Sequence, residues 1–519
     1  MASTSASFLG SIRGRLIAGI TALTLIPLLL LALALGYYAT RQSTAALNQR
    51  ANDQMASIRA GKQEEIQAYF DNVGDLMQTV ARSSEVRQSL REAAATQPQM
   101  AAATDLELAK TALTAYYRND FGKQFSIRNP GLRSDVSDIV AKLPPQTLAA
   151  QYAYIASNQN PLGKKNELKQ ASDGTAFSAM HPRIHDYAEK LVQDYGLYDF
   201  FLVDAQTGFV VYTYFKELDF ATNLRDGPWA QSGLGQAYSK AMAAKASDAV
   251  LITDYAPYRP SYDDQASFIS TPIVEDGRTV GVFIVQLPID RVNQIMTFND
   301  KWKEVGLGES GETYLVGADK APRSVSRFMK ENSTGFVEMM RGLKLPQAQL
   351  ASMDSRDSNI GLMTVDTRGV QSALAGQSGT SVYPDYRGIN VLGSYAPIDV
   401  LGLRWVILSE IDESESNAPV TALQRGIIIA GLGTLLLVGL IVRGISFEYR
   451  SKDSSPRWRR TFDWMIAIGS FLPSLLFGTA FANLARGLPI NEKMMFTGNL
   501  FTLLNPYGLI GGLTMVSVF

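Results

Sequence analysis

The sequence predicts an α+β fold in which two antiparallel-sheet modules follow a long helix, combined with helices that cross a membrane. Three observations support this prediction. Apolar residues recur at helical spacing from Leu47 to Val80, strand-like segments occur in two blocks after Tyr198 and after Gly311, and four stretches are long and apolar enough to span a bilayer. Antiparallel sheets with helices at one end are typical of the α+β class.

Composition excludes several kinds of site. The chain has 519 residues, no cysteine and a net charge of −1. It therefore has no disulfide, thiolate metal site or cysteine nucleophile, and nothing favours nucleic acid as a partner. The two histidines, His181 and His185, are four residues apart. Pro182 lies between them, and no acidic residue does. We predict no metal site and no bound cofactor.

Four stretches are predicted to cross the membrane. The first, Leu16–Thr40, has no charge, exceeds the roughly 20 residues that a span requires, and follows a short segment, residues 1–15, that carries Arg13 and Arg15. A cleaved signal peptide is the alternative, but the apolar run is longer than the usual core of about 7–15 residues, so we predict an uncleaved anchor. The other three predicted spans are Gly426–Val442, Trp464–Leu484 and Met494–Phe519.

Basic residues orient these spans. The loop Phe447–Phe462 is rich in positive charge, with Arg450, Lys452, Arg457, Arg459 and Arg460. The positive-inside rule places this loop and residues 1–15 in the cytoplasm and the segment 41–425 on the other side of the membrane. We therefore expect a multi-pass protein of the bacterial inner membrane with a large periplasmic domain.

Helices open the segment 41–425. The apolar stripe from Leu47 to Val80 marks one face of a long helix. A second helical stretch, with proline-containing breaks, is expected over 105–156, and a third runs into Tyr198. The stripe predicts packing either against the rest of the domain or against a second copy of the same helix.

Strand-like segments follow in two blocks. The first block, about 195–295, begins with a hairpin signal and contains Phe200–Asp204, Phe209–Tyr214, Val250–Asp254, Ala266–Ile273 and Gly281–Leu287. The second block, about 305–412, contains Gly311–Val316, Thr380–Tyr383, Val391–Ile398 and Trp405–Glu410. Each block is predicted to form one antiparallel sheet module.

Several motifs stand out in this region: Tyr198–Asp204, Lys216–Leu224, Gln286–Asp290, and Gly308–Val316 leading to Ser324–Phe328. As a set they resemble the periplasmic double-Cache sensor region of methyl-accepting chemotaxis proteins, over about residues 41–417. The resemblance implies two PAS-like modules on the long helix, a homodimer formed through that helix, and a small-molecule ligand mostly in the first module. We call the first block the distal module and the second the proximal module.

The resemblance does not extend to the subtype that binds amino acids. The clustered arginine–tryptophan–tyrosine signature of that subtype is not found, because Arg225 and Trp229 are spaced differently. An amino-acid ligand is therefore not supported by the sequence.

Polar and aromatic residues at strand ends of the distal module are the candidate ligand contacts: Tyr212, Lys216, Asp219, Asp254, Tyr255 and Tyr258. Aromatic rings with a few charged groups are typical of small-molecule sites. A carboxylate at a strand end can face such a site, so Asp254 is the candidate that would bind an amine. The alternative is that Tyr255–Pro260 forms a rigid proline-containing loop whose tyrosines pack on the surface.

Nothing in the sequence predicts an enzyme. There is no Ser-His-Asp order, no phosphate-binding glycine loop and no distinctive pair of acids. The segment Gly306–Gly311 matches a loose GxGxxG pattern, but it precedes a strand where a dinucleotide site would follow one, so it is predicted to be a turn.

A dense series of motifs follows Val442: Phe447–Lys452, Pro456–Arg459, Phe462–Trp464, Ile468–Pro473, Gly478–Leu484, Phe496–Phe501 and Leu503–Leu509. These motifs resemble subunit II of the cytochrome bd quinol oxidases over residues 443–519. In that family the haems and the quinol site lie in the partner subunit, so the resemblance implies a non-catalytic fragment with the haem-bearing subunit I as a candidate partner. No histidine lies in or near a predicted span, which excludes ordinary histidine ligation of haem.

The two parts of the chain leave three interpretations open. In the first, the protein is a membrane-anchored periplasmic small-molecule sensor that lacks its signalling output and is joined to a truncated oxidase subunit. In the second, it is an accessory subunit of a cytochrome bd oxidase in respiratory electron transfer. In the third, recombination or an assembly error joined two genes within Leu435–Ile441. We expect the sensor region to keep its binding capacity in all three.

Overall fold

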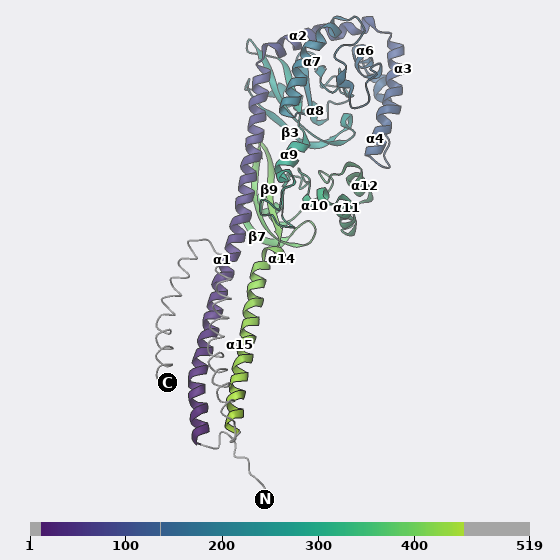
Figure 1. Ribbon diagram of the computed structural model, residues 1–519. Helices are drawn as coiled ribbons and strands as arrows, with labels where there is room; N and C mark the ends of the chain where they lie inside the picture. The colour runs from purple at the N-terminus through teal and green to yellow at the C-terminus, as the bar shows by residue number, and fades with distance from the viewer. Residues whose placement is uncertain (1–11, 135, 451–519) are drawn as a thin grey trace. The chain divides into compact units, whose positions relative to one another are not determined.

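The computed structural model describes residues 12–134 and 136–450 (Figure 1). The chain divides into two compact units, one formed by Asn52–Glu415 and the other by Met1–Ala51 together with Ser416–Phe519. The larger unit contains two antiparallel sheets with helices, as predicted for an α+β fold. The predicted spans Trp464–Leu484 and Met494–Phe519 lie outside the described residues.

The long predicted helix is α1 (Ile12–Ala81), and it includes the whole segment 16–40. Within the larger unit, its apolar stripe is buried in the main hydrophobic core through Ile66, Phe70, Val73, Met77 and Val80. Residues at steps of three and four share one face of a helix, which explains why they are buried together. The stripe therefore packs against the rest of its own domain, the first of the two alternatives that its spacing predicted.

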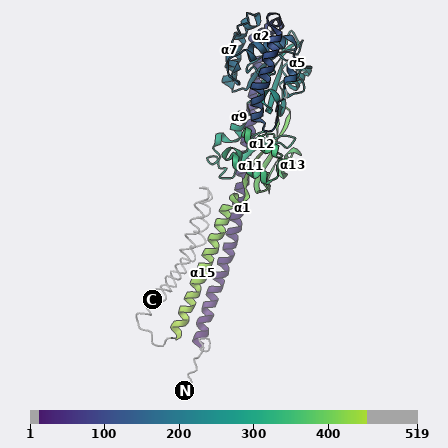
Figure 2. The same ribbon diagram turned by 90° about the vertical axis from the view of Figure 1, so that its right-hand side faces the viewer.

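Short helices follow α1 in the distal part of the larger unit. They are α2 (Ser84–Thr96), η2 (Gln97–Ala103), α3 (Leu106–Tyr116), η3 (Tyr117–Phe121), α4 (Gly122–Arg128), α5 (Ser137–Lys142), α6 (Pro145–Gln151), η4 (Tyr152–Ala156), η5 (Lys165–Glu167) and α7 (Ala176–Tyr195). Asp105 caps α3 by accepting hydrogen bonds from two backbone amides, Thr175 caps α7, and Gly196 ends α7 at φ 63°. The helices α2 and α7 pack against each other (Figure 1 and Figure 2).

The distal module is a five-stranded antiparallel sheet with strand order β2-β1-β5-β4-β3. Its strands are β1 (Asp199–Asp204), β2 (Val210–Thr213), β3 (Leu251–Tyr258), β4 (Asp264–Glu275) and β5 (Arg278–Gln286). The predicted β1–β2 hairpin is confirmed, and Asp276 and Gly277, both at positive φ, form the tight turn between β4 and β5. The helix α8 (Gly233–Ala243) packs on β3 and β4. The register places Asp199 opposite Gln286, so polar residues meet at one end of the sheet.

The proximal module is a four-stranded antiparallel sheet with strand order β6-β9-β8-β7. Its elements are β6 (Glu312–Val316), α10 (Arg327–Glu331), α11 (Ser333–Gly342), α12 (Gln347–Arg356), α13 (Arg368–Leu374), β7 (Gly379–Pro384), β8 (Asn390–Val400) and β9 (Leu403–Asp412). The connection from the distal module contains α9 (Ile289–Met296) and η7 (Phe298–Asp300), and η6 (Arg259–Ser261) follows β3. Leu315 and Ile407 join the main core, whereas Tyr314 and Val406 join a second hydrophobic cluster on the other face of the sheet.

The chain after the proximal module is helical as far as it is described, with α14 (Glu413–Ser416) and α15 (Ala418–Arg450). The segment Ala418–Leu436 of α15 has a mean hydropathy of 1.4 and is the one helix among the described residues that is long and apolar enough to cross a membrane. It overlaps the predicted span Gly426–Val442 and begins eight residues earlier.

Candidate functional site

Four of the six predicted ligand contacts lie together at one end of the distal sheet. Tyr212 lies in β2, next to its last residue, Lys216 and Asp219 lie in the loop after β2, and Tyr258 ends β3. All four side chains are buried. Asp254 and Tyr255 lie away from this group and contact the proximal module. Whether any of the six binds a ligand remains a prediction.

The loop of residues 214–224 is held from the helical side. Gln151 at the end of α6 donates hydrogen bonds to the carbonyl oxygens of Leu218 at 3.0 Å and Phe220 at 2.8 Å. Lys216 has a φ of 60°, a left-handed conformation that non-glycine residues adopt at a cost. These contacts fix the loop so that its charged side chains stay inside the domain.

Buried carboxyl groups form the acidic side of this cluster. Asp199 accepts hydrogen bonds through Oδ1 from the amides of Phe200 at 2.7 Å and Tyr214 at 2.9 Å. Asp219 accepts one through Oδ2 from the hydroxyl of Tyr258 at 2.6 Å. Burial raises the pKa of Asp199, with Asp219 as the next cause, and burial likewise raises the pKa of Asp219.

A third carboxyl group, Glu217, lies next to these aspartates. It accepts hydrogen bonds from the hydroxyls of Tyr198 at 3.1 Å and Ser261 at 2.9 Å. Burial, followed by the charges of Asp219 and Asp199, raises its pKa well above its ordinary value.

Lys216 forms the basic side of the cluster. Its ammonium donates a hydrogen bond to the carbonyl oxygen of Thr213 and lies 4.2 Å from the ring centroid of Tyr212. Burial lowers its pKa. The two histidines of α7 are buried nearby, where His185 Nδ1 lies 2.9 Å from the hydroxyl of Tyr212, and burial lowers the pKa of His185 to about 3 and that of His181 well below its ordinary value. Both imidazoles are therefore neutral.

Several buried acceptor atoms in this cluster have no hydrogen-bond partner within the described protein. They are Asp199 Oδ2, Asp219 Oδ1, Gln286 Oε1 and His181 Nε2. The histidine atom is an acceptor because Nδ1 of the neutral ring must donate to the carbonyl oxygen of Lys169, 2.6 Å away. A buried polar atom without a partner costs roughly 1–3 kcal/mol. A molecule that donates hydrogen bonds would therefore be stabilised here.

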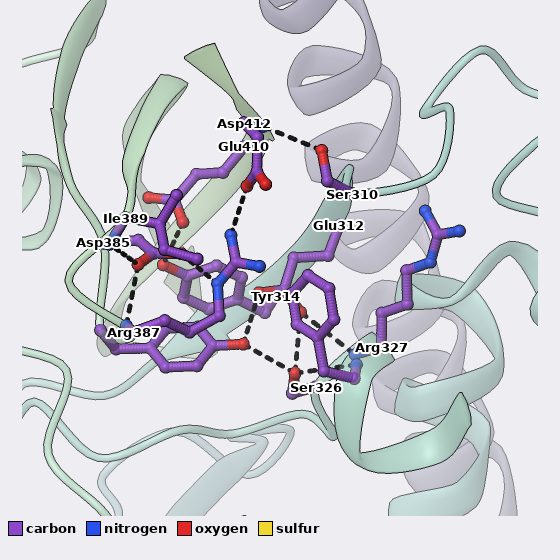
Figure 3. Close-up of polar contacts among 12 residues, drawn as sticks. Ser310, Glu312, Tyr314, Ser326, Arg327, Asp385, Arg387, Ile389, Glu410 and Asp412 are labelled. Carbon is purple, nitrogen blue, oxygen red and sulfur yellow. Dashed lines mark hydrogen bonds and ion pairs between the residues drawn. The ribbon is translucent and has the colours of Figure 1, made fainter. Parts of the chain in front are cut away.

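The proximal module contains a second buried polar cluster, in which the glutamate oxygens all have hydrogen-bond donors from the protein (Figure 3). Glu312 and Glu410 lie opposite each other in the β6–β9 register. Glu410 accepts hydrogen bonds from the hydroxyls of Tyr314 and Tyr383, both at 2.8 Å, and Glu312 accepts one from Tyr386 at 2.6 Å and one from Ser326 at 2.9 Å. Each oxygen of the two glutamates thus has a donor, so the arrangement is that of a structural network.

Arg387 completes this network. Its guanidinium forms ion pairs with Asp385 and with Asp412, the latter at 2.6 Å (Figure 3). It also stacks over the ring of Phe328, whose centroid is 4.1 Å away. These contacts join β9 and α10 to the loop between β7 and β8. They explain the cluster as packing within the proximal module, without a ligand.

Asp254 connects the two modules. Its carboxylate accepts hydrogen bonds from Arg323 Nε at 2.8 Å and Nη2 at 2.9 Å, and from the indole of Trp405 at 3.2 Å. Tyr255 packs on Trp405, with ring centroids 6.0 Å apart. The carboxylate that we assigned to an amine ligand is therefore already bound to an arginine of the proximal module.

Sequence reasoning missed Asp199, Glu217 and Gln286 as members of the cluster. A signal was present, because Asp199 and Gln286 are polar residues at the ends of otherwise apolar strands, where a buried polar side chain requires a reason. Their meeting depends on the β1–β5 register, which no local pattern predicts.

Comparison with known proteins divides the chain into two regions. Residues 137–420 match the family model of the Cache domain, and residues 425–519 match that of cytochrome bd terminal oxidase subunit II. The second match begins before the predicted boundary at Arg443 and includes the apolar segment 426–442, which the sequence alone left to either parent.

Curated relatives of the chain include cytochrome oxidase subunits. The chain is 47% identical over 88 residues to cytochrome bd-I ubiquinol oxidase subunit 2 of Escherichia coli, covering 16% of this chain and 23% of that protein. It is 43% identical over 88 residues to a probable cytochrome oxidase subunit 2 of Haemophilus influenzae, with the same coverage. The chain thus spans about a quarter of the length of the curated relatives that it matches.

Solved structures were also found. The ligand-binding domain of the Pseudomonas fluorescens chemoreceptor CtaA in complex with L-serine aligns with a TM-score of 0.27 and 16% identity over 45% of this chain and 80% of that chain. The ligand-binding domain of the Campylobacter jejuni chemoreceptor Tlp3 in complex with L-norvaline aligns with a TM-score of 0.28 and 11% identity over 65% of this chain and 95% of that chain.

The family assignment rests on the sequence match. Since residues 137–420 make up more than half of the 519 residues, the chain belongs to the Cache domain family, and it carries a C-terminal region similar to cytochrome bd terminal oxidase subunit II.

Proposed function

We propose that this protein is a membrane-anchored sensor whose Cache domain binds a small molecule in the distal module. The observation that carries the proposal is the contrast between the two polar clusters. In the distal module, Asp199, Asp219 and Gln286 each keep a buried acceptor atom without a protein partner. In the proximal module, each oxygen of Glu312 and Glu410 has a donor.

The proposed location is the bacterial inner membrane, with residues 41–425 in the periplasm. The basic loop Phe447–Phe462 and the apolar segment Ala418–Leu436 support this topology. We propose that the domain binds its ligand without converting it, because the distal cluster contains no nucleophile beside a charged base. A homodimer remains part of the proposal, although the stripe Ile66–Val80 of α1 is already used inside one copy.

A direct test uses the fragment 41–425, which we expect to fold as a soluble domain because the compact unit Asn52–Glu415 lies within it. Thermal-shift screening of small polar metabolites should find a compound that raises the melting temperature. Asp219→Asn and Tyr258→Phe should weaken the binding of that compound, whereas Glu410→Gln in the proximal module should leave its binding unchanged. A compound whose binding depends on Glu410 and is indifferent to Asp219 would move the site to the proximal module.

A second candidate function follows from the 47% identity to an oxidase subunit. In this alternative, the C-terminal region assembles with a haem-bearing oxidase subunit, and the chain acts as an accessory subunit in respiratory electron transfer. The matched region covers 23% of the related subunit. Co-purification with the haem-bearing subunit, with quinol-dependent oxygen uptake in a strain that lacks the native subunit II, would favour this alternative.

A further inference from the structure

The acceptor atoms of the distal cluster indicate the class of ligand. We propose that the distal module binds a small organic ammonium ion between Asp199 and Asp219, with Gln286 as a third contact. This inference rests on the proposed function, because it names the ligand class of the same site.

Each of the three residues is held by one atom and leaves another unused. Asp199 uses Oδ1 for backbone amides, and Asp219 uses Oδ2 for the hydroxyl of Tyr258. Gln286 uses Nε2 for the hydroxyl of Ser261 at 3.5 Å. The atoms without a partner are Asp199 Oδ2, Asp219 Oδ1 and Gln286 Oε1, all of them acceptors.

Gln286 is a second observation that points to a ligand, because it is a neutral residue and not one of the acidic residues. Its side chain is uncharged and the residue is only 5% exposed, so an unpaired carbonyl oxygen there is not explained by contact with solvent. Directly opposed residues of antiparallel strands project to the same side of a sheet, which places Gln286 beside Asp199. Ser261 also links Gln286 to the acidic group, since its hydroxyl donates to Glu217 at 2.9 Å.

Charge favours a cation over a neutral donor. Among the described residues, neither Asp199 nor Asp219 forms an ion pair. The charge of Lys216 lowers the pKa of both aspartates, but its ammonium donates to Thr213 and lies over the ring of Tyr212. An ionised carboxylate buried without a partner is very unfavourable. An ammonium group supplies a positive charge and up to three N–H donors, which matches the three free acceptors.

A proton competes with such a ligand. Burial raises the pKa of both aspartates, so each holds a proton more tightly when no cation is bound. The other titratable groups facing them are Lys216 and Glu217 of the same loop, Tyr117 of η3, and the tyrosines at positions 198, 212, 214 and 258 on or beside the strands. On α7, His181 and His185 face Lys216 and stay neutral.

Rising pH should therefore strengthen ammonium binding. The aspartates lose their protons, and Lys216 loses a competing positive charge because burial lowers its pKa. The tyrosines keep their protons because their pKa values are raised, and burial also raises the pKa of Glu217. Displacing one proton changes the affinity by up to about tenfold per pH unit.

The test uses the full chain in detergent, with methylammonium, ethanolamine and ethylenediamine as probes and methanol and ethylene glycol as uncharged controls. Titration calorimetry should show binding of at least one ammonium probe and of neither alcohol. Its affinity should rise several-fold between about pH 6 and about pH 8. Equal binding of the alcohols, no binding of any ammonium probe, or an affinity that falls with rising pH would overturn the proposal.

Isosteric variants locate the site. Asp219→Asn keeps the acceptor oxygen for the hydroxyl of Tyr258, and Asp199→Asn keeps the acceptor oxygen for the backbone amides. Each substitution should lower the affinity for the ammonium probe at least about tenfold. Gln286→Met, which keeps the side-chain volume, provides a second readout if an aspartate variant does not fold. Glu410→Gln makes the same acid-to-amide change in the proximal module and should leave the affinity unchanged.

The outcomes separate this inference from the proposed function. If a neutral or anionic compound binds the fragment 41–425 and loses affinity in Tyr258→Phe, the sensor proposal stands and the ammonium class is wrong. If the ammonium probe binds equally well to both aspartate variants and Gln286→Met, the assigned contacts are wrong.

Discussion

At the scale of single residues, burial decides which charged groups bind and which support the fold. The same residue type, a buried acid, occurs in both modules of this domain. Glu410 has a tyrosine donor for each oxygen, whereas Asp219 keeps one oxygen without a hydrogen-bond partner. The difference in hydrogen-bond supply, and not the presence of charge, makes the distal cluster the candidate site.

Glu410 leads to a prediction about pH. Burial raises its pKa to about 8, while an unfolded glutamate titrates near about 4.3, so the native state binds more protons between these values. The free energy of unfolding should therefore fall as the pH rises through this window, and the contribution of Glu410 is lost above its native pKa.

Glu410→Gln tests this by removing the ionisable group while keeping a hydrogen-bonding side chain. Denaturant unfolding of the fragment 41–425 at several pH values should show a slope smaller by up to about 1.4 kcal/mol per pH unit than in the parent. An unchanged slope in Glu410→Gln would show that this carboxyl group is ionised in the native state.

At the scale of elements, strand β3 connects the two modules. One end of it carries Tyr258, which donates to Asp219 of the distal cluster, and four residues earlier Asp254 accepts hydrogen bonds from Arg323 and Trp405 of the proximal module. A contact between α4 and α12 adds a second connection, in which the hydroxyl of Ser355 donates to a carbonyl oxygen at 2.8 Å. The same strand therefore contacts both the distal cluster and the junction between the modules.

Asp254→Ala should weaken the junction between the modules. Arg323, only 3% exposed in its side chain, would lose both bonds to Asp254 and keep Asp319 as its ion-pair partner. We expect a loss of about 1–3 kcal/mol in the free energy of unfolding of the fragment 41–425, measured by denaturant titration with tryptophan fluorescence. Asp319→Ala, which removes a carboxylate that is 58% exposed, should cost less than about 1 kcal/mol. Equal effects of the two variants would show that Asp254 is not the main partner.

At the scale of the whole molecule, two regions with different relatives are joined within one helix. The Cache match ends at 420 and the oxidase match begins at 425, inside α15. After Val442, the sequence resembles an oxidase subunit. We propose that ligand binding in the Cache domain does not reach a cytoplasmic kinase through residues 443–519.

A swimming assay tests this expectation. Expressed in a bacterial strain without chemoreceptors, the chain should restore no chemotaxis to any compound that the fragment 41–425 binds. A hybrid in which residues 443–519 are replaced by the signalling region of a chemoreceptor is the matched control, and it should respond to the same compound. A ligand-dependent response of the unmodified chain would contradict the prediction.

The sequence by itself determined the elements and the order of the modules. Helical spacing predicted that the face of α1 with Ile66 and Phe70 would be buried, and strand patterning predicted the β1–β2 hairpin, because these signals depend on neighbours a few residues away. Only the tertiary structure decided which polar residues meet. Strand register brings Asp199 and Gln286 together, and Asp254 forms hydrogen bonds with Arg323, 69 residues later in the chain. Such contacts depend on long-range packing and burial, which local patterns do not contain.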